Sequence, residues 1–191
     1  MDELAQRASI DPIELRLRNL APQDARLGAV LHEVARISGW GEKVPEGHGR
    51  GVACCVYRDA TYVAVVVEVA VHAERGAILP TRAWCAHDCG LVVNPDQVEA
   101  QIEGNIAWGC SMALHERMVV SDGELGPDNF DAYPVLRQSR APEVEIALLQ
   151  DPSHPPVGAG EPALAPTPAA VVNAVFAATG RRFRRLPIAL G

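Results

Sequence analysis

An isolated carboxylate is the first feature that could do chemistry. Glu161 lies in the stretch "PPVGAGEPALAP", residues 155–166, and has few polar neighbours along the chain. A surface turn usually carries Asp, Asn or Ser, and a core segment usually excludes Glu. A carboxylate with few polar neighbours loses hydration, which favours its protonated form and suits a general base. Gly158 and Gly160 leave room for a bulky ligand to approach the backbone. The alternative is a tight turn in which Glu161 points at water.

The same stretch also fits the dinucleotide-binding pattern G-x-G-x-x-G/A, through Gly158, Gly160 and Ala163. In that motif the loop follows a strand and opens a helix directly, and an acidic residue lies about 20 residues further on. Here Pro155 and Pro156 precede the loop, the helix start signals come several residues later, and the acidic residue is missing. The dinucleotide interpretation is therefore disfavoured.

A second polar group follows one face of a helix that we predict over residues 94–120, with Asn94 as its N-cap and Pro95 as its first residue. Spacings of three and four place these residues on that face: Gln97, Gln101, Gly104, Asn105 and Trp108. A separate apolar stripe consists of Val98, Ile102, Ile106 and Leu114. The polar face indicates either close packing through glycine with solvated glutamines, or contact with a polar, phosphate-bearing cofactor. Spacing alone does not separate the two.

The cysteines predict reduced, mainly buried thiols. They are Cys54, Cys55, Cys85, Cys89 and Cys110. Their number is odd, and adjacent cysteines on a strand point to opposite faces, which suits no ordinary disulfide. The segment "CAHDC" (85–89) offers a metal clip through Cys85, His87 and Cys89, but zinc sites usually show paired short spacings. We therefore expect neither a disulfide nor zinc.

The elements that must position these residues follow an α+β order, with mixed sheets and inserted helices. Residues 1–40 are predicted to form a helical lead-in, in which Asp11 caps a helix that starts at Pro12. A glycine-rich loop separates this lead-in from a main domain, 41–191. Strands are predicted over 51–57, 61–71, 78–88, 143–150 and 181–188. A last helix is predicted from a Thr167 cap to a stop at Gly180.

The composition excludes several classes of protein. The chain has 191 residues, of which 48% are hydrophobic and 21% charged, with a net charge of −7. Its only strong basic run is 181–185, so a nucleic-acid surface is not expected. The apolar run 61–71 is shorter than the roughly 20 residues of a membrane span, and it contains Glu68. The acidic N-terminus lacks a secretory signal, so we expect a cytoplasmic protein unless it is exported with a partner.

Two long motifs resemble a known family. They are "DCGLVVNPDQVEAQIEGNIAWGCSMAL" (88–114) and "VGAGEPALAPTPAAVVNAVFAATGRRFRRLPI" (157–188). Both are similar to the carboxyl-terminal part of the molybdopterin-binding large subunit of the xanthine dehydrogenase family, in particular of isoquinoline 1-oxidoreductase and related aldehyde dehydrogenases. "DELAQRASIDPIELRLRNL" (2–20) is similar to a helical segment of that subunit. The resemblance covers nearly the whole chain and implies the fold of the carboxyl-terminal molybdenum-cofactor-binding domain.

The resemblance also implies a cofactor and residue roles. The cofactor is molybdenum–molybdopterin cytosine dinucleotide, and the reaction oxidises a carbon of an aldehyde or N-heteroaromatic compound with water-derived oxygen. Glu161 matches the glutamate that takes the proton from the metal-bound hydroxide, and Gly160 matches a glycine beside the metal. Gln101 matches a glutamine that contacts the pterin. Asn94 and Gly104 belong to the same cofactor-facing motif, and none of these residues is implied to be a metal ligand.

The family's large subunit is much longer than this chain. The resemblance therefore implies that an upstream molybdopterin-binding polypeptide shares the cofactor, and that a small iron–sulfur subunit is a second partner. No cysteine spacing here fits an iron–sulfur cluster, so we expect none in this chain. Two functions stay open: the catalytic-base half of a molybdenum hydroxylase, or a non-catalytic remnant or assembly module. A split subunit is expected to expose a large apolar interface, whereas a remnant that is stable without a partner is not.

Overall fold

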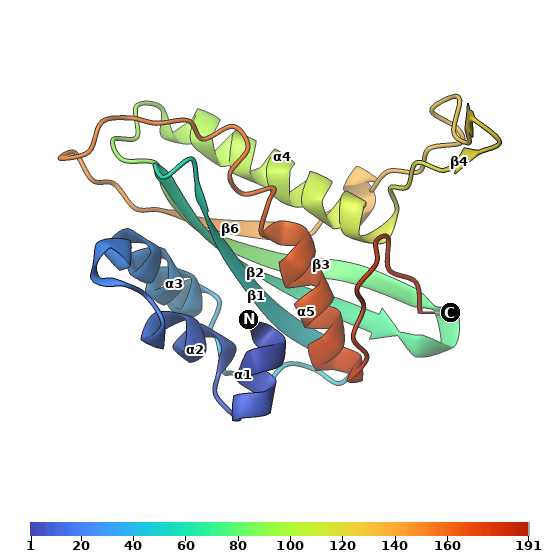
Figure 1. Cartoon of the computed structure of the whole chain (residues 1–191), viewed down its shortest axis with the longest axis horizontal. Coiled ribbons are helices and arrows are strands. Elements are labelled where there is room, and N and C mark those ends of the chain that lie inside the picture. The colour runs from blue at the N-terminus through green and yellow to red at the C-terminus, as the bar shows by residue number, and fades with distance from the viewer. Residues whose placement is uncertain (191) are drawn as a thin grey trace.

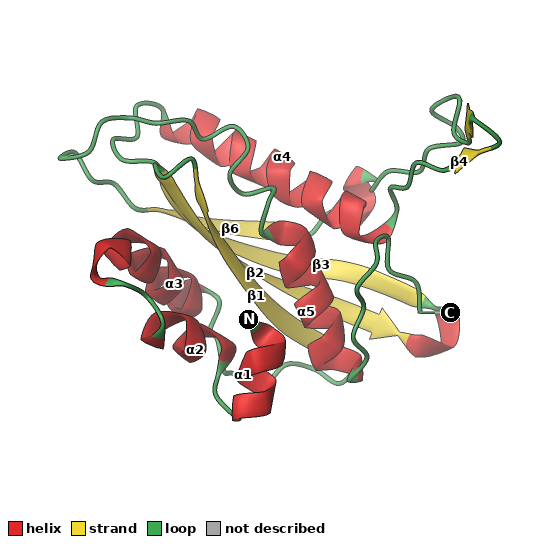
Figure 2. Ribbon diagram, in the orientation of Figure 1, coloured by secondary structure: helices red, strands yellow, loops and turns green. Residues whose placement is uncertain are grey.

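The computed structural model describes residues 1–190, apart from the side chain of Ala73. A four-stranded mixed sheet lies at its centre (Figures 1 and 2). In spatial order the strands are β1 (His48–Tyr57), β2 (Thr61–His72), β3 (Ala77–Asp88) and β6 (Glu143–Leu148). The pairs β1–β2 and β2–β3 are antiparallel, whereas β6 runs parallel to β3. Two two-residue strands, β4 (Val120–Ser121) and β5 (Glu124–Leu125), form a separate small hairpin.

Helices cover both faces of the sheet (Figure 2). On one face lie α4 (Pro95–Leu114) and α5 (Thr167–Thr179). On the other lie α2 (Pro12–Arg18) and α3 (Ala25–Ile37), with α1 (Asp2–Ala8) beside α2. Three short 3₁₀ turns complete the structure: η1 (Pro22–Asp24), η2 (Ala73–Arg75) and η3 (Gln138–Arg140). Within residues 1–190, no helix is long and apolar enough to cross a membrane.

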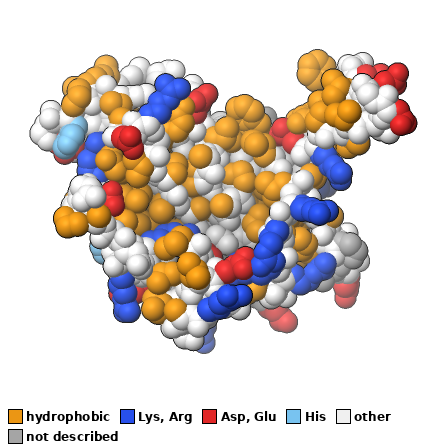
Figure 3. Space-filling view, viewed as in Figure 1, with side chains coloured by type: hydrophobic (Ala, Val, Ile, Leu, Met, Phe, Trp, Pro, Cys, Tyr) orange, Lys and Arg blue, Asp and Glu red, His pale blue; other side chains and the backbone are white. Residues whose placement is uncertain are grey.

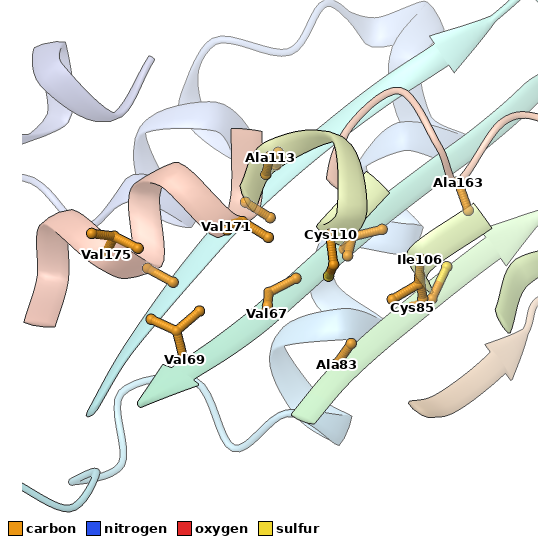
Figure 4. Close-up of a cluster of buried hydrophobic side chains, with 14 of the residues drawn as sticks. Val67, Val69, Ala83, Cys85, Ile106, Cys110, Ala113, Ala163, Val171 and Val175 are labelled. Atoms are coloured by element: carbon orange, nitrogen blue, oxygen red, sulfur yellow. The ribbon is translucent and has the colours of Figure 1, made fainter. Parts of the chain in front are cut away.

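The central strand β2 is buried on both faces, which explains its nearly continuous run of valine. Val63, Val65 and Val67 belong to the core that faces α4 and α5, in which Figure 4 labels Val67, while Val66 faces α3. β-branched side chains pack well on a pleated surface, so such a run favours a strand covered on both sides. The predicted strands at 51–57, 61–71, 78–88 and 143–150 are confirmed, although β1 begins earlier, at residue 48.

The amino-terminal helices use caps that are visible in the sequence. The Asp11 carboxylate accepts hydrogen bonds from the N–H groups of Ile13 (2.8 Å) and Glu14 (3.1 Å), so the predicted cap is confirmed. In α3, Val30 and Leu31 are completely buried against the sheet, as its helical periodicity predicts. The division of the chain at residue 40 stays a prediction.

Close approach of backbones positions α5 between β1 and α4. A Cβ added to Gly51 of β1 would lie 2.2 Å from Ala174 N and 2.3 Å from Ala170 O, both in α5. On α5's other side, a Cβ added to Gly109 of α4 would lie 2.5 Å from the Thr167 Cβ. Gly51 therefore fixes the middle of α5 and Gly109 its first residue, which follows directly on the Glu161 stretch.

Three predictions about individual elements are wrong. The 94–120 helix ends at Leu114, where the N–H groups of His115 and Glu116 share the Ser111 carbonyl, and residues 117–125 beyond it are exposed. Thr167 is the first residue of α5 rather than its cap, since its hydroxyl donates to Ala163 O at 2.7 Å. Residues 181–188 form no strand: the Ile188 N–H bonds to the end of α4 rather than to a sheet edge. The stop at Gly180, with φ +70°, is confirmed.

Candidate functional site

The predicted site residues gather at one end of the sheet. β3 and β6 are parallel, so the connections that leave them toward α4 and α5 start from the same edge. The turn between β1 and β2 lies there too, since Tyr62 at the start of β2 pairs with Asp88 at the end of β3. The topology thereby brings together three segments: the β1–β2 turn, the start of α4, and residues 157–162, which we call the glycine loop.

Asp88 organises the connections at this edge. Arg26 of α3 donates two hydrogen bonds to its carboxylate, from Nε at 2.8 Å and from Nη2 at 2.6 Å. The Gly90 N–H donates a third, at 3.0 Å. Gly90 has φ +73°, and a Cβ there would lie 2.4 Å from Pro155 O, so the β3–α4 connection packs directly on the segment that leads into the glycine loop.

We expect Asp88→Asn to destabilise the chain at neutral pH by about 2–3 kcal/mol, because it leaves the partly buried Arg26 guanidinium without its counter-charge and without a full set of acceptors. Burial of Asp88 opposes ionisation most strongly, but the hydrogen bonds from Arg26 and Gly90 outweigh it and hold the pKa of Asp88 below its usual range. The ionised form therefore stabilises the fold above the unfolded pKa of about 3.9, and this contribution is lost as pH falls through the lower folded pKa.

Urea unfolding of the wild-type chain and Asp88→Asn between about pH 7 and pH 3 measures both effects. The difference between the two proteins should shrink on acidification. Glu14→Gln is the control, because it breaks an ion pair with Arg18 in which both side chains are exposed, and such pairs contribute about 0–1 kcal/mol. An Asp88→Asn difference that is no larger than the control's, or that is independent of pH, would contradict this account.

The glycine loop is held from beneath through its carbonyl groups. Three side chains donate to them: Thr61 to Gly158 O at 2.9 Å, Asn105 to Gly160 O at 2.7 Å, and Cys55 to Pro162 O at 3.5 Å. The Val157 N–H also bonds to Cys89 O at 3.1 Å. Within residues 1–190, no acceptor is bonded to the N–H groups of residues 158–160. The loop therefore keeps free donors while its own position is fixed.

No contact or backbone angle within residues 1–190 requires glycine at position 158 or 160. A Cβ on Gly158 would meet nothing within 4 Å, and a Cβ on Gly160 would meet only the Gln101 Oε1, at 3.7 Å. Neither residue has a positive φ. The space beside both glycines is therefore open to a ligand that closely approaches the backbone, which fits a large polar cofactor.

Glu161 lines an open pocket of about 490 Å³ between the glycine loop and the β1–β2 turn. The Tyr57 hydroxyl donates to the Glu161 Oε2 at 2.5 Å, and this hydrogen bond is the main cause that raises the pKa of Tyr57. In this chain the Glu161 side chain is exposed. The expectation of a desolvated carboxylate without polar neighbours is therefore wrong here. Its hydrogen-bond donor, Tyr57, lies 104 positions away in the sequence, so the residues around Glu161 gave no sign of it.

Gln101 lies on the other side of the glycine loop. It lines a pocket of about 310 Å³ that shares Val157 and Gly160 with the Glu161 pocket. The two side chains thus lie at the same end of the domain, in adjacent pockets. Gln101 itself is exposed in this chain.

The other residues of the α4 motif have separate places. The Asn94 side chain caps α4 by accepting from the Gln97 N–H at 3.2 Å, and both residues line the Gln101 pocket. Gly104 lines a different hollow, so the structure does not bring it to that pocket. Asn105, by contrast, is buried and anchors the glycine loop, a role that its position in the polar stripe did not reveal.

The "CAHDC" segment lies inside the fold. Cys85 and His87 are completely buried, and both ring nitrogens of His87 lack a hydrogen-bond partner. Burial lowers the pKa of His87 to about 4. All five cysteines are free and three are buried, which confirms mainly buried thiols; Cys54 and Cys55 pack on opposite faces of the sheet. Residues 1–190 contain no group of three His, Cys, Asp or Glu side chains that could hold a metal ion.

A sequence profile of the molybdopterin cofactor-binding domain family matches residues 20–142. This chain belongs to that family. It is 36% identical to the beta subunit of isoquinoline 1-oxidoreductase from Brevundimonas diminuta, over 98% of this chain and 24% of the relative. It is 35% identical to a nicotinate dehydrogenase subunit of Pseudomonas putida, over 98% of this chain and 17% of the relative. It therefore spans about a quarter or less of the length of these relatives.

Two solved oxidoreductase structures share the fold of this chain. Quinoline 2-oxidoreductase from Pseudomonas putida 86 matches with a TM-score of 0.58 and 30% identity, over 66% of this chain and 17% of that chain. Aldehyde oxidoreductase from Desulfovibrio desulfuricans ATCC 27774 matches with a TM-score of 0.58 and 28% identity, over 66% of this chain and 14% of that chain. The predicted family and its α+β fold are both confirmed.

Proposed function

We propose that this chain is the part of a molybdenum hydroxylase that supplies the catalytic base, Glu161, and one wall of the cofactor site. The observation that carries the proposal is the glycine loop, whose free N–H groups and open glycines separate the Glu161 pocket from the Gln101 pocket. The names of the relatives support an aldehyde or an N-heteroaromatic compound as the substrate.

The residues fit a large polar cofactor. When bound, molybdenum–molybdopterin cytosine dinucleotide supplies the redox chemistry by which a substrate carbon gains an oxygen atom derived from water. On this chain, the Gln101 amide and the N–H groups of residues 158–160 would hold polar atoms of that cofactor. Thr61 and Asn105 keep the loop in place, so its donors need no rearrangement on binding. Glu161 accepts the proton that the oxidation releases.

A projecting apolar segment supports assembly with a partner. Residues 115–142, which we call the arm, connect α4 to β6. The part that carries β4 and β5 extends away from the sheet in Figure 1, and Figure 3 shows apolar and acidic side chains on it, whereas Leu136 packs back against the core. The exposed large apolar residues of the arm are Met118, Val119, Val120, Leu125, Phe130 and Val135. Phe130 is 95% exposed. Large apolar side chains that are exposed together usually mark a surface that a partner covers. The arm therefore favours the interpretation that this chain is part of a split subunit over the interpretation that it is a remnant that is stable without a partner.

We propose that the upstream molybdopterin-binding polypeptide covers the arm and completes the cofactor site, and that a small iron–sulfur subunit carries the electrons away. Co-expression with the neighbouring genes, followed by metal analysis of the purified complex, tests this. We expect about one molybdenum per complex and none bound stably to the chain alone. A stable complex that contains no molybdenum would refute the proposed function.

The arm can be tested separately by a matched pair of variants. Leu125→Asp places a charge on the arm at a leucine that is 61% exposed, and Leu4→Asp does the same on α1 at a leucine that is 58% exposed. We expect Leu125→Asp to weaken co-purification by at least about 10-fold, the effect of burying one unpaired polar group at an interface, and Leu4→Asp to leave it unchanged. Equal recovery of both variants would show that the arm is not the interface.

A further inference from the structure

One neighbour of Glu161 has no role in the function proposed above. Tyr57 is the last residue of β1, and its hydroxyl points at the Glu161 carboxylate across the pocket. It pairs in the sheet with Thr61, whose own side chain holds the glycine loop. One end of the β1–β2 hairpin thus fixes both the backbone of the loop and the side chain that the loop carries.

We propose that Tyr57 is a positioning residue that holds the Glu161 carboxylate in the orientation in which it accepts a proton; this inference rests on the proposed function. The phenol occupies Oε2, and Oε1 has no hydrogen-bond partner within residues 1–190. Glu161 is exposed, and an exposed glutamate without an anchor samples many rotamers. A hydrogen bond to a carboxylate is charge-assisted and stronger than a neutral one, so it suits this anchoring.

The phenol holds the carboxylate without adding a positive charge. Arg58 also lines the pocket, but its guanidinium lies over the Tyr57 ring, 5.4 Å from the ring centre. Within residues 1–190, Glu161 forms no salt bridge. A full positive charge at that position would favour the carboxylate so strongly that proton acceptance would suffer, whereas a neutral donor orients it at lower cost to its basicity.

A spectroscopic titration tests the contact without the cofactor. The chain has three tyrosines, so the near-ultraviolet absorbance of tyrosinate is simple to assign with Tyr57→Phe. The Glu161 carboxylate opposes ionisation of the phenol, which is why the pKa of Tyr57 is raised. We therefore expect Glu161→Gln to lower the pKa of Tyr57. Glu116→Gln, which alters the partner of Tyr133, should leave Tyr57 unchanged. An identical Tyr57 titration in wild type and Glu161→Gln would overturn the inference.

Kinetics of the assembled enzyme test the consequence. We expect Tyr57→Phe to lower kcat by about 10-fold with little change in KM, because the base loses its orientation while the binding surface remains. Trp40→Phe is the matched control, since it also removes a hydrogen bond from an aromatic side chain to a carboxylate, that of Asp11 at 2.8 Å, and lies outside both the Glu161 pocket and the arm. It should leave kcat unchanged.

The two proposals fail in different ways. If Glu161→Gln is inactive while Tyr57→Phe matches the wild type, the positioning role is overturned and the proposed base stands. If Glu161→Gln is fully active, the proposed function is overturned, whatever the titration shows. Thermal unfolding of the Tyr57→Phe variant confirms that the fold is retained before either comparison is made.

Discussion

Glu161→Gln is expected to lower kcat of the assembled, molybdenum-loaded enzyme by about 100- to 10,000-fold, the usual contribution of a positioned general base. The amide keeps the shape of the carboxylate but cannot accept the proton. The chain's stability should change little, because Glu161 is exposed and the Tyr57 hydroxyl can donate to an amide oxygen. Steady-state and single-turnover kinetics, with molybdenum measured in the same preparation, check the result.

The molybdenum content should be unchanged in Glu161→Gln, since the proposal gives Glu161 no role as a metal ligand. Glu14→Gln is the control, because Glu14 also accepts a hydrogen bond from a side chain, that of Arg18, and is part of neither the Glu161 pocket nor the arm. If Glu161→Gln with full molybdenum turns over within a few-fold of the wild type, then Glu161 is an ordinary turn residue. The tight-turn interpretation of the sequence would then be correct.

The second large effect is on stability. Gly51→Ala is expected to reduce the free energy of unfolding by about 3 kcal/mol, the upper part of the range for overpacking. The added Cβ would lie 2.2 Å from Ala174 N and 2.3 Å from Ala170 O. Both obstacles are backbone atoms, which cannot move aside by changing a rotamer, so α5 must shift away from β1. The glycine loop precedes α5 and should shift with it.

Urea unfolding of the chain measures this effect, and Gly104→Ala is its matched control. A Cβ at Gly104 would meet nothing within 4 Å, and the residue lies in the interior of α4. Alanine is favoured over glycine in a helix by about 1 kcal/mol, so the control should be stabilised. If Gly51→Ala were as stable as wild type, β1 and α5 could not be as close as described.

Local signals predicted most elements of the fold. The cap residues Asp11 and Asn94 and the stop at Gly180 each mark an element that the structure contains. The runs of β-branched residues mark the strands, because such side chains pack well on a pleated surface. The wrong predictions concern segments whose secondary structure depends on tertiary contacts rather than on local sequence. Residues 181–188 alternate like a strand, but the Ile188 N–H bonds to α4 instead of to a strand, and the helix that starts at Pro95 ends at Leu114 rather than at residue 120.

The site was only partly visible in the sequence. Glu161, Gly160 and Gln101 stood out through their unusual neighbours and the family resemblance, and the structure brings them to one end of the sheet. Tyr57 did not stand out, because its contact with Glu161 spans 104 residues and depends on strand pairing. The residues adjacent to Glu161 in sequence are apolar, but its neighbours in space are not. Such contacts follow from topology rather than from local pattern.

The topology also sets an order in which the molecule can fold. The turns at residues 58–60 and 73–76 let β1, β2 and β3 pair as local hairpins, whereas β6 joins β3 only after residues 89–142 have closed a long loop. Closing a long loop costs more chain entropy, so local pairings form first. The glycine loop follows β6, and its anchors come from the finished hairpin and from α4. We therefore expect the glycine loop to be among the last parts of the chain to form, with amide hydrogen exchange slower in β2 than in residues 157–162.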